Sequence, residues 1–355
     1  MIIVKNISQN DIFYYSLVQI NGKIKPFCFC NQIEVLNLTS DIRTVWPLTI
    51  FGYFKVFCEL NIGENIVKLS CLHNSIEICL KYLQEHFYNS VEILLITCSD
   101  TKSSFFRNTN LSIETYINRI LLSIKLVQCF VAESLFKNGF QKRTFNLKQG
   151  VDIFKSKLTT DECLSKNEKE LWHYFAKEIT QMKSEKVVNT KWIAFMSFTE
   201  YKVNENKVPT CHEDVIKLTK GYSALGSNGL ALLGTGNIYC FPENLNQLSN
   251  SLINCCKVDR ALLMDDSAFR GFYWSNFSTA LGTILHELCH CFGMGHSNIG
   301  IMNRGGDDIN IVLSFSVGDK DCQLCLPKLR KKSSLERRDL YNLEKESKKY
   351  RFKGI

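Results

Sequence analysis

The sequence predicts an α+β protein of several domains, in which an N-terminal β-sandwich precedes an α/β domain with a mixed, twisted sheet. Three observations support this prediction. The chain has 355 residues, and a domain usually contains about 100–200. Short strand-like segments fill residues 1–100, whereas strong helical patterns begin only after them. The second half also contains a helix with closely spaced histidines.

The N-terminal domain is assigned to residues 1–100. Segments rich in Val, Ile, Phe and Leu occur at Gly52–Leu60, Asn65–Cys71 and Val91–Cys98, separated by Gly and Asn residues. Several short strands at this spacing are typical of a β-sandwich. Periodicity does not decide whether Ser75–Tyr88 forms a helix or a further pair of strands.

The second domain is assigned to residues 101–326. Apolar residues follow helical spacing over Ile113–Asn138, and Gly139 supplies a stop. A charged helical stretch at Asn167–Lys186 precedes a buried strand at Lys191–Ser197. Gly229–Phe241 reads as another strand. The combination predicts a sheet packed against two long helices.

Charge and composition exclude several classes of protein. The hydrophobic fraction of 45% and the charged fraction of 22% argue against a disordered chain. The net charge is +8, of which +7 lies in a basic tail at residues 327–355, predicted to be largely helical. The nearly neutral remainder gives no reason to expect nucleic-acid binding. The tail is interpreted as a solvated helix, with contact to an acidic partner or a membrane surface as the alternative.

The sequence also bears on the compartment. Apolar runs such as Val91–Cys98 are far shorter than the roughly 18–20 residues of a membrane span. At the N-terminus, Lys5 interrupts the apolar Ile2–Val4 before a signal peptide could form. We therefore expect a cytoplasmic protein, in which most of the sixteen cysteines are buried thiols rather than disulfides.

One motif dominates the chemistry. His286 and His290 are four residues apart, so on a helix their imidazoles lie on one face and can reach one metal ion. Glu287 occupies the position of a general base in the zinc-protease helix motif. Gly293 can turn the chain sharply out of the helix and bring His296 to the same ion. Three imidazoles with one open position are typical of a catalytic zinc site. A chance match with structural histidines is the competing interpretation.

This extended motif resembles that of the metzincins, which are named for a methionine turn below the zinc. Met302, within Gly300–Gly306, is the candidate for that turn. Within the metzincins, the chain most resembles a zinc metalloproteinase family of fungi and some animals. Patches over residues 40–315 carry the likeness, among them Thr44–Pro47, Gln128–Glu133, Lys137–Phe140, Arg143–Phe145 and Phe272–Trp274.

The resemblance implies a substrate-binding edge strand, since metzincin-like folds pair an extended peptide with such a strand above the zinc. Our candidate is Leu230–Tyr239, where Leu232 is followed by Gly234 and Gly236, which would permit close approach of the peptide. An ordinary buried strand is the alternative interpretation.

The archaemetzincins, which add a second zinc held by cysteines, offer another comparison. Cys322 and Cys325 would form half of such a site, but the partner cysteines expected just after the third histidine are missing. Cys289 and Cys291 lie inside the catalytic helix instead. We therefore expect one catalytic Zn²⁺ and no second, structural zinc.

The leading expectation is a metalloendopeptidase that cleaves a peptide or protein substrate with a zinc-activated water. Glu287 would act as the general base. One alternative is a zinc-binding protein of the same fold without turnover, against which Glu287 argues. Another is a zinc hydrolase of a non-peptide amide, which the residues at the zinc do not exclude.

Overall fold

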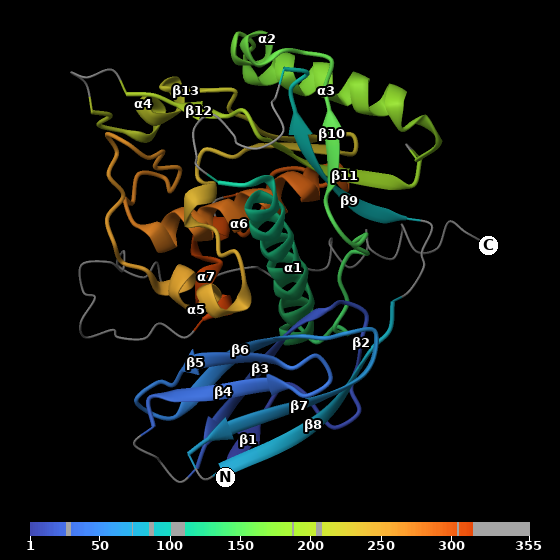
Figure 1. Ribbon diagram of the computed structural model, residues 1–355, viewed down its shortest axis with the longest axis vertical. Coiled ribbons are helices and arrows are strands. Elements are labelled where there is room, and N and C mark those ends of the chain that lie inside the picture. Colours follow the sequence, from blue (N-terminus) through green and yellow to red (C-terminus); the bar gives the residue numbers. More distant parts are fainter. Residues whose placement is uncertain are drawn as a thin grey trace.

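The protein has a mixed α+β fold, seen here in a computed structural model (Figure 1). Two N-terminal sheets lie at one end, and a larger sheet with its helices lies at the other (Figure 1). The predicted tail at 327–355, with Cys322 and Cys325, lies outside the described residues. These are residues 1–25, 30–72, 74–84, 89–100, 111–186, 188–203, 208–303 and 305–314.

The N-terminal part contains two sheets. The first has the order β1-β3-β6 and is antiparallel, with strands Ile2–Val4, Leu17–Ile24 and Tyr53–Glu59. The second has the order β2-β8-β7-β4-β5, with strands Ile12–Phe13, Asn74–Tyr82, Gly63–Cys71, Gln32–Asn37 and Ile42–Pro47. The segment that periodicity left open therefore forms strand β8 as far as Tyr82.

The two N-terminal sheets share one hydrophobic core. Trp46 of β5 packs on Phe57 of β6, with ring centroids 5.5 Å apart, and both side chains are buried. Alternate residues of β4 and β7 point into this core, as the two-residue period of a half-buried strand requires. Burial of apolar side chains thus joins the two sheets.

The larger sheet has the order β10-β9-β11-β15-β14. Its strands are Asp152–Lys155, Ser90–Thr97, Thr190–Met196, Leu230–Gly234 and Ala224–Ser227. The first four strands in this order run parallel, and β14 is antiparallel to β15. By its pairing β9 belongs to this sheet, although the sequence placed Val91–Cys98 with the N-terminal strands. Its nearly continuous burial is typical of a parallel strand covered on both faces.

Helices cover both faces of this sheet. On one face Ile193 and Phe195 share a core with helices α1 (Ile113–Lys137) and α6 (Tyr273–Cys291). On the other face Trp192 and Ala194 share a core with α2 and α3, which span Thr160–Leu164 and Glu168–Met182. The smaller elements are α4 (His212–Lys217), α5 (Leu245–Ile253), α7 (Asn310–Leu313), η1 (Ser184–Lys186), η2 (Ile238–Cys240), η3 (Gly305–Asp308), β12 (Glu200–Tyr201) and β13 (Thr219–Lys220).

The ends of the long helices follow local sequence signals. The hydroxyl of Ser112 caps the start of α1, and the chain leaves this helix at Gly139, whose φ is +85°. Asn167 forms a capping box with Glu170 at the start of α3. In the described part of the chain, every helix falls short of the length or the apolar character that crossing a membrane demands.

Polar contacts tie the N-terminal strands to the helical part. Lys55 of β6 donates hydrogen bonds of 3.0 Å to three carbonyl oxygens at the end of α7, those of Ile311, Val312 and Ser314. Gln19 of β3 donates to the carbonyl oxygens of Val312 and Leu313 at 3.3 and 3.2 Å. The last described helix is therefore anchored on two strands of the first sheet.

Candidate metal centre

Helix α6 holds the first two histidines of the motif on one face. His286 and His290 lie one turn apart, and their Nε2 atoms are 3.0 Å from each other. Leu281, Leu285 and Leu288 on the same helix are buried in the core. The apolar side of α6 thus fixes the helix against the sheet and leaves its histidine side facing outward.

The third histidine arrives by a sharp turn after α6. Gly293 has a φ of +81°, a conformation that favours glycine, and the N–H of Met294 bonds back to the carbonyl oxygen of Cys289 at 3.0 Å. His296 then places its Nε2 atom 3.2 Å from that of His290. The bend expected at Gly293 is therefore present, and it brings all three rings together.

Backbone carbonyls orient two of the three rings. Nδ1 of His286 lies 2.7 Å from the carbonyl oxygen of Ile301, and Nδ1 of His290 lies 2.8 Å from that of Met294. Each Nδ1 must carry the proton to donate these bonds, which leaves the Nε2 lone pairs directed at one another. Histidines that bind a metal usually donate their other ring N–H to a backbone carbonyl or a carboxylate in this way.

The donor set fits a zinc ion. The candidate ligand atoms of His286, His290 and His296 all lie within 4.8 Å of one another. Among the described residues, these three form the cluster of His, Cys, Asp or Glu side chains that could hold a metal ion. In a tetrahedral site with Zn–N bonds of about 2.0–2.1 Å, ligand nitrogens are roughly 3.3 Å apart. The separations of 3.0 and 3.2 Å are close to that spacing. The geometry therefore suits three imidazole ligands to one Zn²⁺.

Met302 lies in a turn that contacts this cluster. Its side chain is buried, and its carbonyl oxygen accepts a hydrogen bond from the N–H of Ser297 at 3.1 Å. Gly300, with a φ of +78°, begins the turn. The Ile301 carbonyl oxygen in this turn accepts the hydrogen bond from Nδ1 of His286. This turn therefore orients His286, and the role of Met302 as a methionine turn stays a prediction.

Glu287 points toward strand β14 rather than into solvent. Its Oε2 accepts a hydrogen bond of 2.6 Å from the N–H of Gly226. Burial raises the pKa of Glu287 to about 7, although the Gly226 N–H opposes this change and Glu168 adds to it. A Cβ on Gly226 would lie 2.1 Å from the carbonyl oxygen of Glu287, so only glycine permits this approach of strand and helix.

The predicted substrate strand is wrong in its position. Strand β15, which contains Leu232 and Gly234, lies between β11 and β14 and has no free edge. Leu232 is fully buried, and the chain past Gly236 forms the short helix η2 instead of extending the strand. The edge strand beside the histidines is β14, which sequence analysis missed. Its four residues are too few, and too poor in β-branched side chains, to give a periodic signal.

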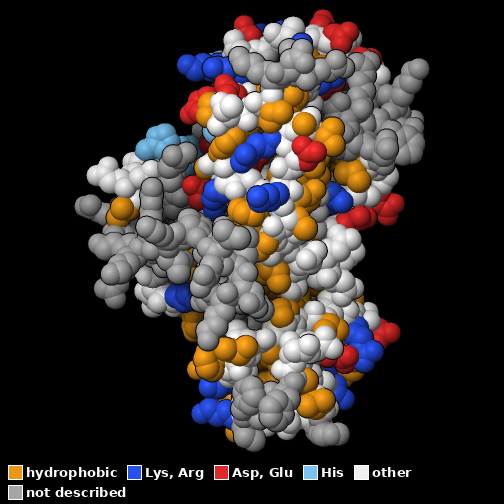
Figure 2. All heavy atoms as spheres, turned by 90° about the vertical axis from the view of Figure 1, so that its left-hand side faces the viewer, with side chains coloured by type: hydrophobic (Ala, Val, Ile, Leu, Met, Phe, Trp, Pro, Cys, Tyr) orange, Lys and Arg blue, Asp and Glu red, His pale blue; other side chains and the backbone are white. Residues whose placement is uncertain are grey.

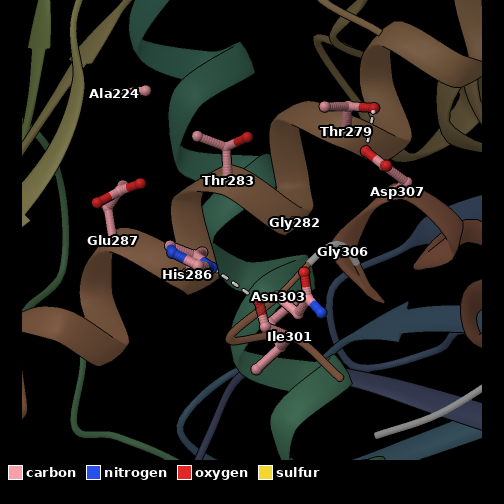
Figure 3. Close-up of a pocket in the computed structure, with 10 residues that line it drawn as sticks. All are labelled: Ala224, Thr279, Gly282, Thr283, His286, Glu287, Ile301, Asn303, Gly306 and Asp307. Carbon is pink, nitrogen blue, oxygen red and sulfur yellow. Dashed lines mark hydrogen bonds between the residues drawn. The ribbon is translucent and has the colours of Figure 1, made fainter. Parts of the chain in front are cut away.

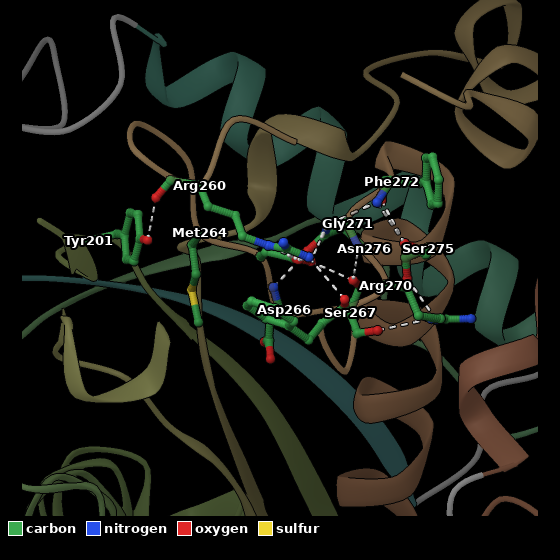
Figure 4. Close-up of polar contacts among 12 residues, drawn as sticks. Tyr201, Arg260, Met264, Asp266, Ser267, Arg270, Gly271, Phe272, Ser275 and Asn276 are labelled. Carbon is green, nitrogen blue, oxygen red and sulfur yellow. Dashed lines mark hydrogen bonds and ion pairs between the residues drawn. The ribbon is translucent and has the colours of Figure 1, made fainter. Parts of the chain in front are cut away.

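A polar network holds the start of α6 in place (Figure 4). The carboxylate of Asp265 is fully buried and binds Arg260 at 2.8 Å, Asn276 at 3.1 Å and the hydroxyl of Ser267. Arg270 donates to the carbonyl oxygens of Ser267, Ser275 and Asp307 and to the hydroxyl of Thr279. These bonds fix the segment before α6 to the helix and to η3.

The described side chains on the face shown in Figure 2 do not carry one sign of charge. On the face shown in Figure 2, basic and acidic side chains of the described residues are interspersed, and histidine side chains reach the surface. Of the three clustered histidines, His296 is exposed, while His286 and His290 are half-buried. The cluster is therefore open to a ligand from outside.

Comparison with known proteins adds two kinds of finding. A family model with the description "Putative peptidase family" matches residues 1–325. A protein of Schizosaccharomyces pombe named a putative zinc metalloproteinase is 22% identical, over 90% of this chain and 55% of the relative. A protein of Saccharomyces cerevisiae with the same designation is 25% identical, over 73% of this chain and 41% of the relative.

The chain thus spans about half the length of the curated relatives it matches. Among solved structures, a carbohydrate acetylesterase from Xanthomonas citri is 9% identical, over 61% of this chain and 56% of that chain. Its TM-score of 0.20 is too low to bear on the fold.

Proposed function

The chain belongs to the putative peptidase family whose model it matches over residues 1–325, and from this premise we propose that it is a zinc-dependent metallopeptidase. One observation carries the proposal. The Nε2 atoms of His286, His290 and His296 converge. Glu287, which follows His286 on α6, is buried and accepts a hydrogen bond from the edge strand β14. The zinc metalloproteinase names of the two fungal relatives support the same activity.

The three histidines would hold the ion, and bound zinc would supply a Lewis acid that activates water and polarises the scissile carbonyl. Glu287 would take the proton from the attacking water and pass it to the departing amine. The Gly226 N–H keeps one carboxylate oxygen in a fixed place, so the other is the one that handles the proton.

A peptide substrate would bind in an extended form along β14. This strand pairs with β15 on one side only. On its other side the N–H groups of Ala224 and Gly226 already donate to Glu168 and Glu287, so the strand would offer its carbonyl oxygens to a peptide. Gly226, at the third position of β14, adjoins Glu287. The backbone of a peptide on this strand would therefore pass close to the histidine cluster.

We also propose that a β-sandwich precedes a metzincin-like catalytic unit in this chain. Parallel strands with an antiparallel edge strand, a histidine helix below them and a turn at Met302 support a metzincin-like catalytic unit. The shared core of the two N-terminal sheets supports a β-sandwich before it.

Zinc titration combined with digestion of an unbiased peptide library tests the proposed activity. The protein should bind one equivalent of zinc and cleave peptides, and a chelator should abolish cleavage until zinc is restored. His296→Ala should lose both properties, whereas His173→Ala, outside the cluster, should keep them. Stoichiometric zinc with no cleavage of any peptide would instead indicate a binding protein. Cleavage restricted to non-peptide amides would indicate a different hydrolase.

A further inference from the structure

A cavity of about 220 Å³ opens beside His286 and Glu287 (Figure 3). Pockets for whole ligands usually measure roughly 300–1,000 Å³, so this one has room for a single side chain. Its walls come from α6, β14, the turn at Met302 and η3. The lining residues at the end away from Glu287 include Thr279 and Asp307.

Asp307 is held firmly at that end of the pocket. Its Oδ1 accepts a hydrogen bond from the hydroxyl of Thr279 at 3.2 Å. Its backbone carbonyl accepts from Arg270 at 2.9 Å and from the hydroxyl of Ser278 at 2.8 Å. In the described part of the chain, no hydrogen bond involves its Oδ2. One carboxylate oxygen therefore remains available to a ligand in the pocket.

Among the described residues that line the pocket, the charged side chains are acidic. They are Asp307 and Glu287, and this lining contains neither lysine nor arginine. Arg270 lies behind Thr279 and directs its donors to three carbonyl oxygens and the Thr279 hydroxyl. An ammonium or guanidinium group entering the pocket would find a partner in Asp307, and hydrogen bonds between two charged groups are about twice as strong as neutral ones.

The direction of β14 decides which substrate residue reaches the pocket. A peptide that pairs antiparallel with this strand runs from the Ser227 end toward the Ala224 end. Gly226 adjoins Glu287, and Ala224 lines the pocket. For a peptide that runs in this direction, the side chain that enters the pocket would belong to the residue that follows the cleaved bond.

We propose that Asp307 is a specificity-determining residue, which makes this pocket select lysine or arginine directly after the cleaved bond. The inference rests on the proposed peptidase function for its meaning. Its binding component can nevertheless be measured without turnover, so the two can fail separately.

The test uses the zinc-loaded Glu287→Gln protein, which should bind peptides without cleaving them. Calorimetry would compare blocked alanine hexapeptides that differ in carrying lysine, norleucine or glutamate at one central position. Norleucine matches lysine in shape but lacks the ammonium group. Lysine should bind about tenfold more tightly than norleucine, because a hydrogen bond to a charged group contributes that much, and glutamate should bind most weakly.

Two variants in the same background identify the residue responsible. Asp307→Asn should bring the lysine peptide to the affinity of the norleucine peptide, and Asp307→Lys should reverse the preference toward glutamate. Glu185→Gln, which alters an exposed carboxylate in η1, should leave the preference unchanged. Thermal unfolding and zinc stoichiometry establish that each variant is folded. Equal binding of lysine and norleucine, or a lysine preference that survives Asp307→Asn, would overturn the inference.

Library digestion by the wild-type enzyme separates the two claims. Cleavage before lysine and arginine, lost in Asp307→Asn, supports both. Cleavage with no basic preference overturns the role of Asp307 and leaves the peptidase intact. Lysine-selective binding without any cleavage contradicts the peptidase and supports the role of the pocket.

Discussion

Gly282 of α6 packs directly on the backbone of Gly306, and a Cβ on Gly282 would lie 2.4 Å from the Gly306 carbonyl oxygen. Gly282 lies one helical turn before His286, so this contact sets η3 against the helix that carries the histidines. The reciprocal approach is also tight, with a Cβ on Gly306 only 2.8 Å from the α-carbon of Gly282. Both glycines line the pocket next to Glu287.

The Gly282→Ala variant should be less stable than the wild type. Alanine is the better helix former by roughly 0.5–1 kcal/mol, but its methyl group would push η3 away, and overpacking costs about 1–3 kcal/mol. We expect a lower urea midpoint together with weaker cleavage. Gly295→Ala is the control, because no atom lies within 4 Å of a Cβ at that position. An unchanged midpoint in Gly282→Ala would show that the contact is loose.

The Glu287→Gln variant should lose turnover and keep zinc. Glutamine preserves the shape of the side chain and still allows its oxygen to accept from Gly226, but it cannot take a proton. General-base catalysis contributes about 10²–10⁴-fold to rates, so kcat should fall by at least about 10²-fold. Metal analysis should find the same zinc content as in the wild type. Full activity in this variant would exclude Glu287 as the base.

Asp266 should make the stability of the fold depend on pH. Burial, helped by the neighbouring Asp265 and Asp307 carboxylates, raises the pKa of Asp266 from 3.8 to about 7. Between these values the folded chain holds a proton that the unfolded chain has released. The contribution of Asp266 to the free energy of unfolding therefore falls as pH rises from about 4 to about 7, and it is constant above that range.

The Asp266→Asn variant should remove this component, because the amide stays neutral at every pH. Relative to the wild type, it should be more stable at about pH 8 than at about pH 5. Thermal unfolding followed by circular dichroism at both pH values measures the difference. Asp259→Asn, at an exposed carboxylate, is the matched control. Parallel pH profiles for Asp266→Asn and the wild type would contradict the expected shift.

The Arg270→Lys variant should be destabilised despite its retained charge. The guanidinium reaches four oxygens in different directions, and a single ammonium nitrogen cannot replace it. An oxygen that loses its donor costs about 1–3 kcal/mol when fully buried and less at these partly buried positions, and urea unfolding would detect the loss of several such bonds. Arg43→Lys, at an arginine whose side chain is 65% exposed, should change stability by less than about 0.5 kcal/mol. Equal effects of the two substitutions would argue against a bracing role.

The histidine cluster is the part of the site that sequence reasoning could predict. Spacing alone puts His286 and His290 on one helical face, and Gly293 signals the turn that returns His296. The long helix α1 was equally readable, since its apolar period and the stop at Gly139 are local features. In each case the residues that determine the structure lie close together in the sequence.

Features that depend on distant pairing could not be predicted in this way. Strand β15 reads as a free apolar strand, and only the presence of β11 and β14 on its two sides makes it internal. Strand β14 is a four-residue segment whose importance comes from the contact of Gly226 with Glu287. In the sequence Gly282 is a residue that weakens a helix. The structure shows that it permits the close contact with Gly306. Such pairings arise from tertiary packing, which periodicity does not report.

The anchoring of α7 on Lys55 and Gln19 has a practical consequence for dissecting this molecule. A recombinant fragment that starts beyond the first two sheets would strip those donors from the carbonyls of α7 and uncover the apolar side of α1. Such a fragment would expose carbonyl groups of α7 without hydrogen-bond donors and apolar side chains of α1. We therefore expect it to aggregate. If a protease cuts the chain between the first two sheets and the helical part, the two pieces should stay bound to each other and elute together on gel filtration.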